Sequence, residues 1–98
     1  SSLNVPEQFV LYPNYPNPFN PITTMRYDLQ DDAHVTLTIH DLMGREVITL
    51  VDGPKTAGSR FTQWNARDEQ GRAVSAGLYL YTIQADQYSK TNKMALIK

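Results

Sequence analysis

Apolar and polar residues alternate along most of this chain, which is the pattern of β-strands that bury one face. Residues 46–51 are also expected to form a strand, but their apolar side chains lie on both faces and do not alternate with polar ones. The alternating segments lie at residues 24–29, 34–40, 60–65, 79–83 and about 88–97. The side chains expected to face the core are Met25, Tyr27, Leu29, Val35, Leu37, Ile39, Trp64, Tyr79, Tyr81, Ile83, Met94 and Leu96.

Polar segments separate these expected strands, at residues 30–33, 41–45, 52–58 and 68–72. Gly44 in the second segment is available for the positive φ that many turns require. Six or seven short strands, with turns about every 8–12 residues and no helical window, predict an all-β fold. A β-sandwich is favoured over a small barrel, and we expect no internal repeat.

Residues 13–21 hold four of the six prolines of the chain. Proline fixes φ and lacks an N–H donor, so this segment is neither a helix nor a central strand. Tyr15 and Phe19 are too apolar for a solvated linker, and we expect both rings to fasten the segment onto the fold. From composition alone, a stiff lead-in and a family signature are equally open interpretations.

Composition limits the class of protein. The 98 residues suffice for one domain, and 41% hydrophobic and 19% charged residues are typical of a folded globular chain. A net charge of −1 argues against a nucleic-acid partner, and no apolar run is long enough to span a membrane. The start lacks a signal-peptide pattern, so we expect Ser1 to mark a boundary inside a longer protein, with residues 1–8 as a lead-in to a domain at 9–98.

Candidate catalytic and metal-binding groups are sparse. His34 and His40 share one strand face but stand ~20 Å apart, too far to hold one metal ion. The chain has no cysteine, and Ser59, Ser75 and Ser89 lie in no nucleophile-elbow pattern. We therefore expect no enzymatic activity, no cofactor and no metal centre.

Carboxylates and aromatic residues need separate consideration. Asp28, Asp31 and Asp32 surround one turn and Asp68-Glu69 lie in another, but their spacing matches no EF-hand and is better explained by solvated turns. Of the aromatic residues, Tyr27, Tyr79 and Tyr81 lie on core faces, whereas Phe61 has the opposite parity to Trp64 and is expected at the surface. One exposed phenylalanine is not a sugar-stacking platform.

Several motifs, taken in order, resemble a known family. They are Tyr15–Pro21, Thr23–Tyr27, Val35–Val47, Trp64–Gly71, Ala76–Tyr81 and Lys93–Lys98. From about Phe9 to Lys98 the chain resembles the type A C-terminal sorting domain of type IX secretion cargo. Its middle section is shared with the immunoglobulin-like domain of the flagellar hook-capping protein. Asn65-Ala66 stands where the family often has Asp-Gly, a departure expected to alter only a turn.

The resemblance implies an immunoglobulin-like antiparallel β-sandwich of about seven strands that acts as a targeting signal for export. A larger upstream cargo would reach the periplasm by its own signal, and the type IX translocon and its shuttle proteins would recognise the folded domain. The cargo would then be secreted or held at the cell surface of a Gram-negative bacterium. The recognition residues it implies are Pro16, Asn17, Pro18, Gly44, Gly77, Tyr79, Lys93 and Lys98.

The last expected strand suits such a role, because an amphipathic strand offers a backbone edge to a partner. Lys90, Lys93 and Lys98 add positive charge that could steer it towards an acidic receptor, although such lysines also protect exposed edges from aggregation. Two other interpretations remain open. One is a structural module, and the other is a carbohydrate-binding module of a secreted enzyme, which would need exposed aromatics from among Tyr15, Phe61 and Tyr88.

Overall fold

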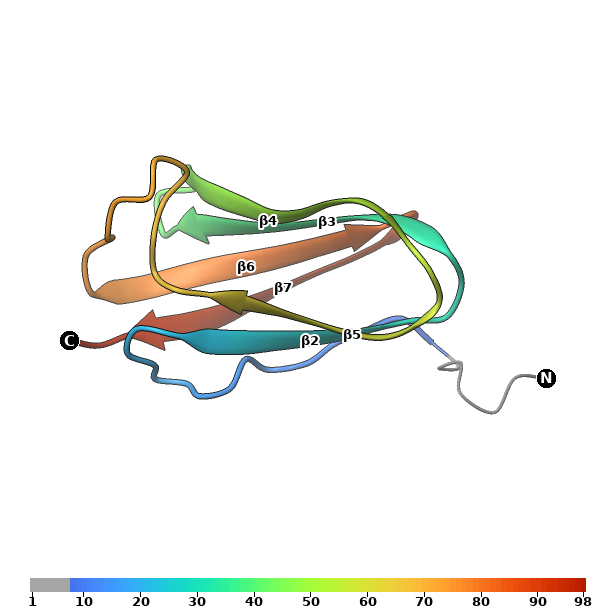
Figure 1. Cartoon of the computed structure of the whole chain (residues 1–98), viewed down its shortest axis with the longest axis horizontal. Coiled ribbons are helices and arrows are strands. Elements are labelled where there is room, and N and C mark those ends of the chain that lie inside the picture. The colour runs from blue at the N-terminus through green and yellow to red at the C-terminus, as the bar shows by residue number, and fades with distance from the viewer. Residues whose placement is uncertain (1–7) are drawn as a thin grey trace.

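The computed structural model describes residues 8–98, and these form two facing antiparallel sheets (Figure 1). No helix in the described part of the chain is long and apolar enough to cross a membrane. The strands are β1 (Val10–Leu11), β2 (Thr23–Leu29), β3 (Ala33–Asp41), β4 (Glu46–Lys55), β5 (Gly58–Trp64), β6 (Gly77–Ala85) and β7 (Tyr88–Leu96).

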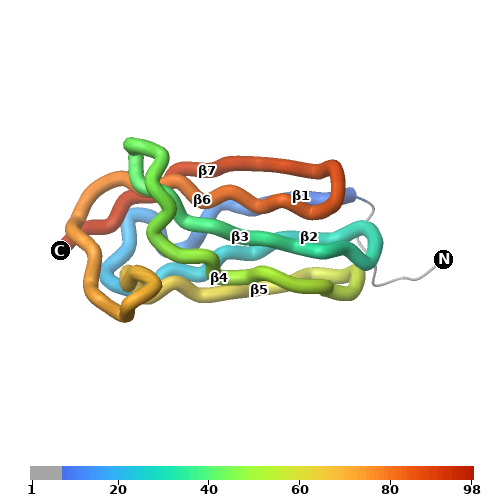
Figure 2. The backbone as a smooth tube through the Cα atoms, turned by 90° about the horizontal axis from the view of Figure 1, so that it is seen from above, coloured from blue at the N-terminus to red at the C-terminus, as the bar shows by residue number. Residues whose placement is uncertain are grey.

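One sheet has the strand order β1-β2-β5 and the other has the order β4-β3-β6-β7. All neighbouring strands within the sheets are antiparallel. The strands run along the long axis of the molecule, and β1 lies on the side of β6 and β7 (Figure 2). This arrangement confirms the prediction of an antiparallel immunoglobulin-like sandwich with seven strands.

The core lies between the two sheets and confirms the parity that the alternation predicted. The ring of Trp64 is central, with its centroid 5.7 Å from that of Phe19 and 5.4 Å from that of Tyr79. The expected core residues are all buried, namely Met25, Tyr27, Leu29, Val35, Leu37, Ile39, Trp64, Tyr79, Tyr81, Ile83, Met94 and Leu96.

The predicted turn at residues 52–58 is wrong over most of its length, because β4 continues to Lys55. Gly53 and Pro54 lie inside the strand, with Pro54 opposite His34 of β3. A strand tolerates proline here because β4 is an edge strand, so the missing N–H costs no hydrogen bond to a neighbour. The short strand β1 was also not predicted.

The proline segment belongs to the domain, but only one of its two aromatic residues fastens it. Phe19 is 1% exposed and packs in the core, whereas Tyr15 is 80% exposed. Tyr15 is held by its backbone instead, which exchanges hydrogen bonds of 2.9 and 2.8 Å with Thr24 of β2. Thr24 lies between the inward residues of β2, so this pairing places the Tyr15 ring on the outer face of the sheet.

Candidate recognition surface

The proline segment, the β3–β4 turn, the loop between β5 and β6, and the end of the chain gather at one end of the sandwich (Figure 1). We call this the C-terminal end. The described part of the chain begins towards the opposite end (Figure 1). Most of the predicted recognition residues come from these four segments, which are distant in sequence.

The proline segment pairs with the last residues of β7. The Phe19 N–H donates to the Ala95 carbonyl at 3.0 Å, and the Ile97 N–H donates to the Phe19 carbonyl at 3.0 Å. The Asn17 Oδ1 accepts a further hydrogen bond of 3.0 Å from the Ala95 N–H. Pro18 lies between these two anchors. This end of the β7 edge is therefore already covered by the chain itself.

The remainder of the β7 edge is open among the described residues. Ala95 directs its backbone groups away from β6, and in a strand this direction recurs at every second residue. The backbone of Ser89, Thr91 and Lys93 therefore also faces outwards, and no hydrogen bond from these groups to the described chain is present. Lys93 is exposed beside this edge. The edge that the sequence suggested for a partner is thus three outward-facing residues long.

A buried polar cluster under the proline segment was not predicted. The Asn14 N–H donates to the Tyr81 hydroxyl at 2.8 Å, and that hydroxyl donates to the Tyr12 carbonyl at 3.0 Å. The Asn14 amide also donates to the Thr23 hydroxyl at 2.9 Å and to the Pro16 carbonyl at 3.2 Å. Burial raises the pKa of Tyr81 and keeps its hydroxyl protonated as a donor. These bonds fix where the segment leaves β1 and reaches Pro16.

Gly44 lies in a tight turn organised by Asp41. The Asp41 carboxylate accepts hydrogen bonds from the N–H groups of Met43 and Arg45, at 2.9 and 3.0 Å, and from Arg45 Nε at 2.9 Å. Gly44 has a φ of 86°, a conformation that strains residues with a side chain. The Arg45 N–H is the main cause that lowers the pKa of Asp41, so the carboxylate stays charged.

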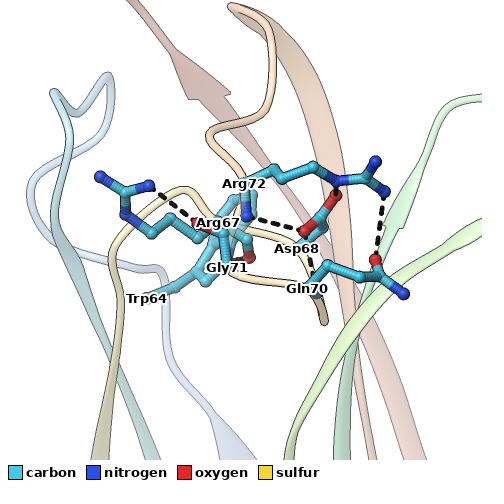
Figure 3. A network of polar contacts seen from close by, with 6 residues as sticks. All are labelled: Trp64, Arg67, Asp68, Gln70, Gly71 and Arg72. Atoms are coloured by element: carbon cyan, nitrogen blue, oxygen red, sulfur yellow. Dashed lines mark hydrogen bonds and ion pairs between the residues drawn. The ribbon is translucent and has the colours of Figure 1, made fainter.

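The same turn occurs again in the β5–β6 loop, at Asp68–Arg72 (Figure 3). The Asp68 carboxylate accepts from the N–H groups of Gln70 and Arg72, both at 3.0 Å, and from Arg72 Nε at 3.2 Å. Gly71 has a φ of 80°, and the Arg72 N–H is the main cause that lowers the pKa of Asp68. Asp-x-x-Gly-Arg is therefore a turn motif that occurs twice in this domain, which was not predicted.

The two turns lie beside each other and line one open pocket of 390 Å³. Glu69 links the second turn to β4, the strand that follows the first turn, because its carboxylate accepts the Thr49 N–H at 3.1 Å. Arg45 and Arg72 keep most of their side chains exposed, and Met43 projects at the tip of the first turn. The C-terminal end therefore presents two fixed guanidinium groups and an apolar side chain.

Comparison with known proteins identifies the family. The family model of the FlgD Ig-like domain matches residues 21–89. The chain belongs to this family. No curated protein matches it.

Similar solved structures share the fold of this FlgD Ig-like domain. Dimeric latent PorU from Porphyromonas gingivalis has a TM-score of 0.70 at 20% identity, over 92% of this chain and 9% of that one. PorZ, described as an essential surface component of the type-IX secretion system of P. gingivalis, has a TM-score of 0.62 at 23% identity, over 94% of this chain and 12% of that one. FlgD from P. aeruginosa has a TM-score of 0.60 at 20% identity, over 97% of this chain and 74% of that one. The chain thus spans about a tenth of the length of PorU and PorZ.

The remaining predicted recognition residues differ in accessibility. Gly77 begins β6 and is exposed, and Lys98 is exposed and lines a pocket of 340 Å³ with Asn20 and Pro21. Tyr79 is buried, and its hydroxyl donates to the Ser75 carbonyl at 2.5 Å. Tyr79 therefore offers a partner only a small exposed part of its side chain, where it lines a pocket with Gly77.

The described residues contain no cluster of three metal-ligating side chains. His34 contacts Asp52 at 2.9 Å on the exposed face of β3 and β4. Asp28 does not fit the expectation of a solvated turn, because it lies in β2 and is buried. Its burial raises the pKa of the carboxyl, but hydrogen bonds from the hydroxyls of Tyr12 at 2.6 Å and Ser59 at 2.7 Å outweigh this and lower it overall.

Proposed function

We propose that this FlgD Ig-like domain is a non-catalytic C-terminal secretion signal. It directs a larger upstream cargo to the type IX translocon and its shuttle proteins, for export across the outer membrane and retention at the cell surface. The translocon or its shuttle proteins recognise the C-terminal end of the folded sandwich. The likeness in fold to PorZ, a type-IX component, supports this proposal.

One observation carries the proposal. The family match covers residues 21–89, so Phe19 and Leu96 both lie outside it. These two flanking segments nevertheless pair with each other through the bridge between Phe19 and Leu96. Through this bridge the proline segment and the end of β7 together form the surface of the C-terminal end, which suits a signal that a partner recognises in its folded form.

The proposed function can be tested by removing positive charge from the C-terminal end. Lys93 and Lys98 are exposed, and changing both to glutamine keeps Met94 and Leu96 in the core. A secreted reporter fused to residues 1–98 should be exported less by the Lys93→Gln/Lys98→Gln variant in a bacterium with a type IX system. Its melting temperature should change little, because exposed charges contribute little to stability.

A matched variant controls for net charge. Lys55→Gln with Lys90→Gln removes the same number of charges away from the C-terminal end, since Lys55 ends β4 and Lys90 is the third residue of β7. This variant should be exported as well as the unchanged fusion. Export of a reporter that lacks residues 9–98 altogether would contradict the proposed function. Full export of the Lys93→Gln/Lys98→Gln variant would mean that recognition does not need these two charges. Recognition would then lie at the turns around Gly44 and Gly77.

A further inference from the structure

The outer face of the β1-β2-β5 sheet carries a groove that none of the predicted recognition residues lines. It has a volume of 490 Å³ and a mainly apolar surface. We call it the aromatic groove, and its main lining residues are Tyr12, Pro13, Tyr15, Thr24, Arg26 and Phe61. It lies on the face of a sheet that does not contain β7.

Two large aromatic rings of the groove are exposed to solvent. Tyr15 is 80% exposed and Phe61 is 66% exposed. Tyr15 pairs with Thr24 and Phe61 pairs with Arg26, and these two residues of β2 have the same parity. Both rings therefore stand on one face of one sheet. Sequence parity placed Phe61 at the surface, but it could not show that Tyr15 joins it.

The floor of the groove is a fixed guanidinium group. The Arg26 guanidinium lies 4.3 Å from the centre of the Tyr12 ring and 5.9 Å from that of Phe61. Its Nε and Nη2 are directed to the Asp28 carboxylate at 3.4 and 3.5 Å. Asp28 is itself held by Tyr12 and Ser59. The charge of Arg26 is thus offset by Asp28, while its Nη1 donates no hydrogen bond to the described residues.

Two exposed aromatic rings beside a hydrogen-bond donor with little net charge suit one class of ligand. A neutral sugar ring has a face of C–H groups that packs on aromatic rings and hydroxyls that accept hydrogen bonds from a fixed donor. An acidic peptide or nucleic acid would find little net positive charge, because Asp28 offsets Arg26. We propose that the aromatic groove binds a neutral hexose unit of a glycan. Tyr15 and Phe61 contact the sugar faces, and Arg26 donates to a hydroxyl. This site is independent of the secretion role.

The test uses the ¹⁵N-labelled 98-residue chain and NMR titration with maltohexaose, cellohexaose and mannohexaose. At least one of these should shift the backbone amides next to Tyr15, Arg26 and Phe61. Hexagalacturonate and a hexaglutamate peptide serve as charged probes. If none of the three neutral oligosaccharides shifts these amides, or if either charged probe binds more tightly, the proposal is wrong.

Variants locate the site. Tyr15→Ser and Phe61→Ser should each weaken binding of the oligosaccharide by about tenfold, which corresponds to about 1.4 kcal/mol. Both side chains are exposed, so the urea midpoint should stay near that of the unchanged chain. Leu42→Ser with Met43→Ser removes exposed apolar side chains at the C-terminal end and should leave binding unchanged. Equal affinity of Phe61→Ser and the unchanged chain would overturn the proposal.

Discussion

Replacing Phe19 by alanine should remove the main side-chain contact between the proline segment and the sandwich. The ring is 1% exposed, and full burial of a phenylalanine side chain contributes about 1.5–3 kcal/mol. Its contact with Trp64, at 5.7 Å between centroids, adds about 0.5–1.5 kcal/mol. The cavity left behind adds a further cost, so we expect Phe19→Ala to lower the free energy of unfolding by about 3–5 kcal/mol.

Such a loss is a large part of the about 5–15 kcal/mol that stabilises a domain of this size. It should lower the melting temperature by at least about 12 °C. Urea unfolding followed by tryptophan fluorescence is the direct assay, because Trp64 is the only tryptophan of the chain and touches the altered site. The matched control is Tyr15→Ala in the same segment. Its ring is exposed, so the free energy of unfolding should change by no more than about 0.5 kcal/mol.

The contrast between these two variants is what the structure predicts and the sequence did not. A loss below about 1 kcal/mol for Phe19→Ala would mean that the ring is not packed against Trp64, and our account of the segment would fail. An equal loss for both variants would restore the original expectation that both rings fasten the segment.

Two further predictions concern polar groups. The pKa values of Asp41 and Asp68 are lowered in the folded state, so their contribution to stability is complete above about pH 4 and is lost as the pH falls through the folded-state values. Asp41→Asn with Asp68→Asn should therefore flatten the fall of the urea midpoint between pH 7 and pH 3, and an unchanged slope would contradict this. Tyr81→Phe should cost about 1–3 kcal/mol in urea unfolding, because it leaves the Asn14 N–H buried without its acceptor; a neutral effect would mean that the buried polar cluster is not needed.

The sequence predicted the core well because strand periodicity is a local property. Once a segment is a strand, every second side chain must face the same way, so Val35, Leu37 and Ile39 could be assigned without knowing their partners. The segment at 52–58 could not be assigned in this way. Gly53 and Pro54 usually mark a turn, and only the position of β4 at the sheet edge allows them to continue a strand.

The candidate site was harder to predict, because its features depend on which segments meet. Tyr15 and Phe19 look equivalent in sequence, and only the pairing of one with Thr24 and of the other with Leu96 sends their rings in opposite directions. The repeated turns are different, since Asp-x-x-Gly-Arg is visible at Asp41 and again at Asp68. That pattern can be recognised from the sequence alone, whereas no local feature indicates that the two turns line one pocket.

The pairing of the proline segment with the end of β7 affects how a partner could recognise this domain. Pro21 and Lys98 line one pocket, although they are 77 positions apart in the sequence. They come together because Phe19 pairs with Leu96, and that pairing requires the sandwich to hold β2 and β7 in place. In an unfolded chain these residues would be far apart on average. A receptor that contacts both therefore binds only the folded domain, so recognition of the C-terminal end would at the same time test whether the domain has folded.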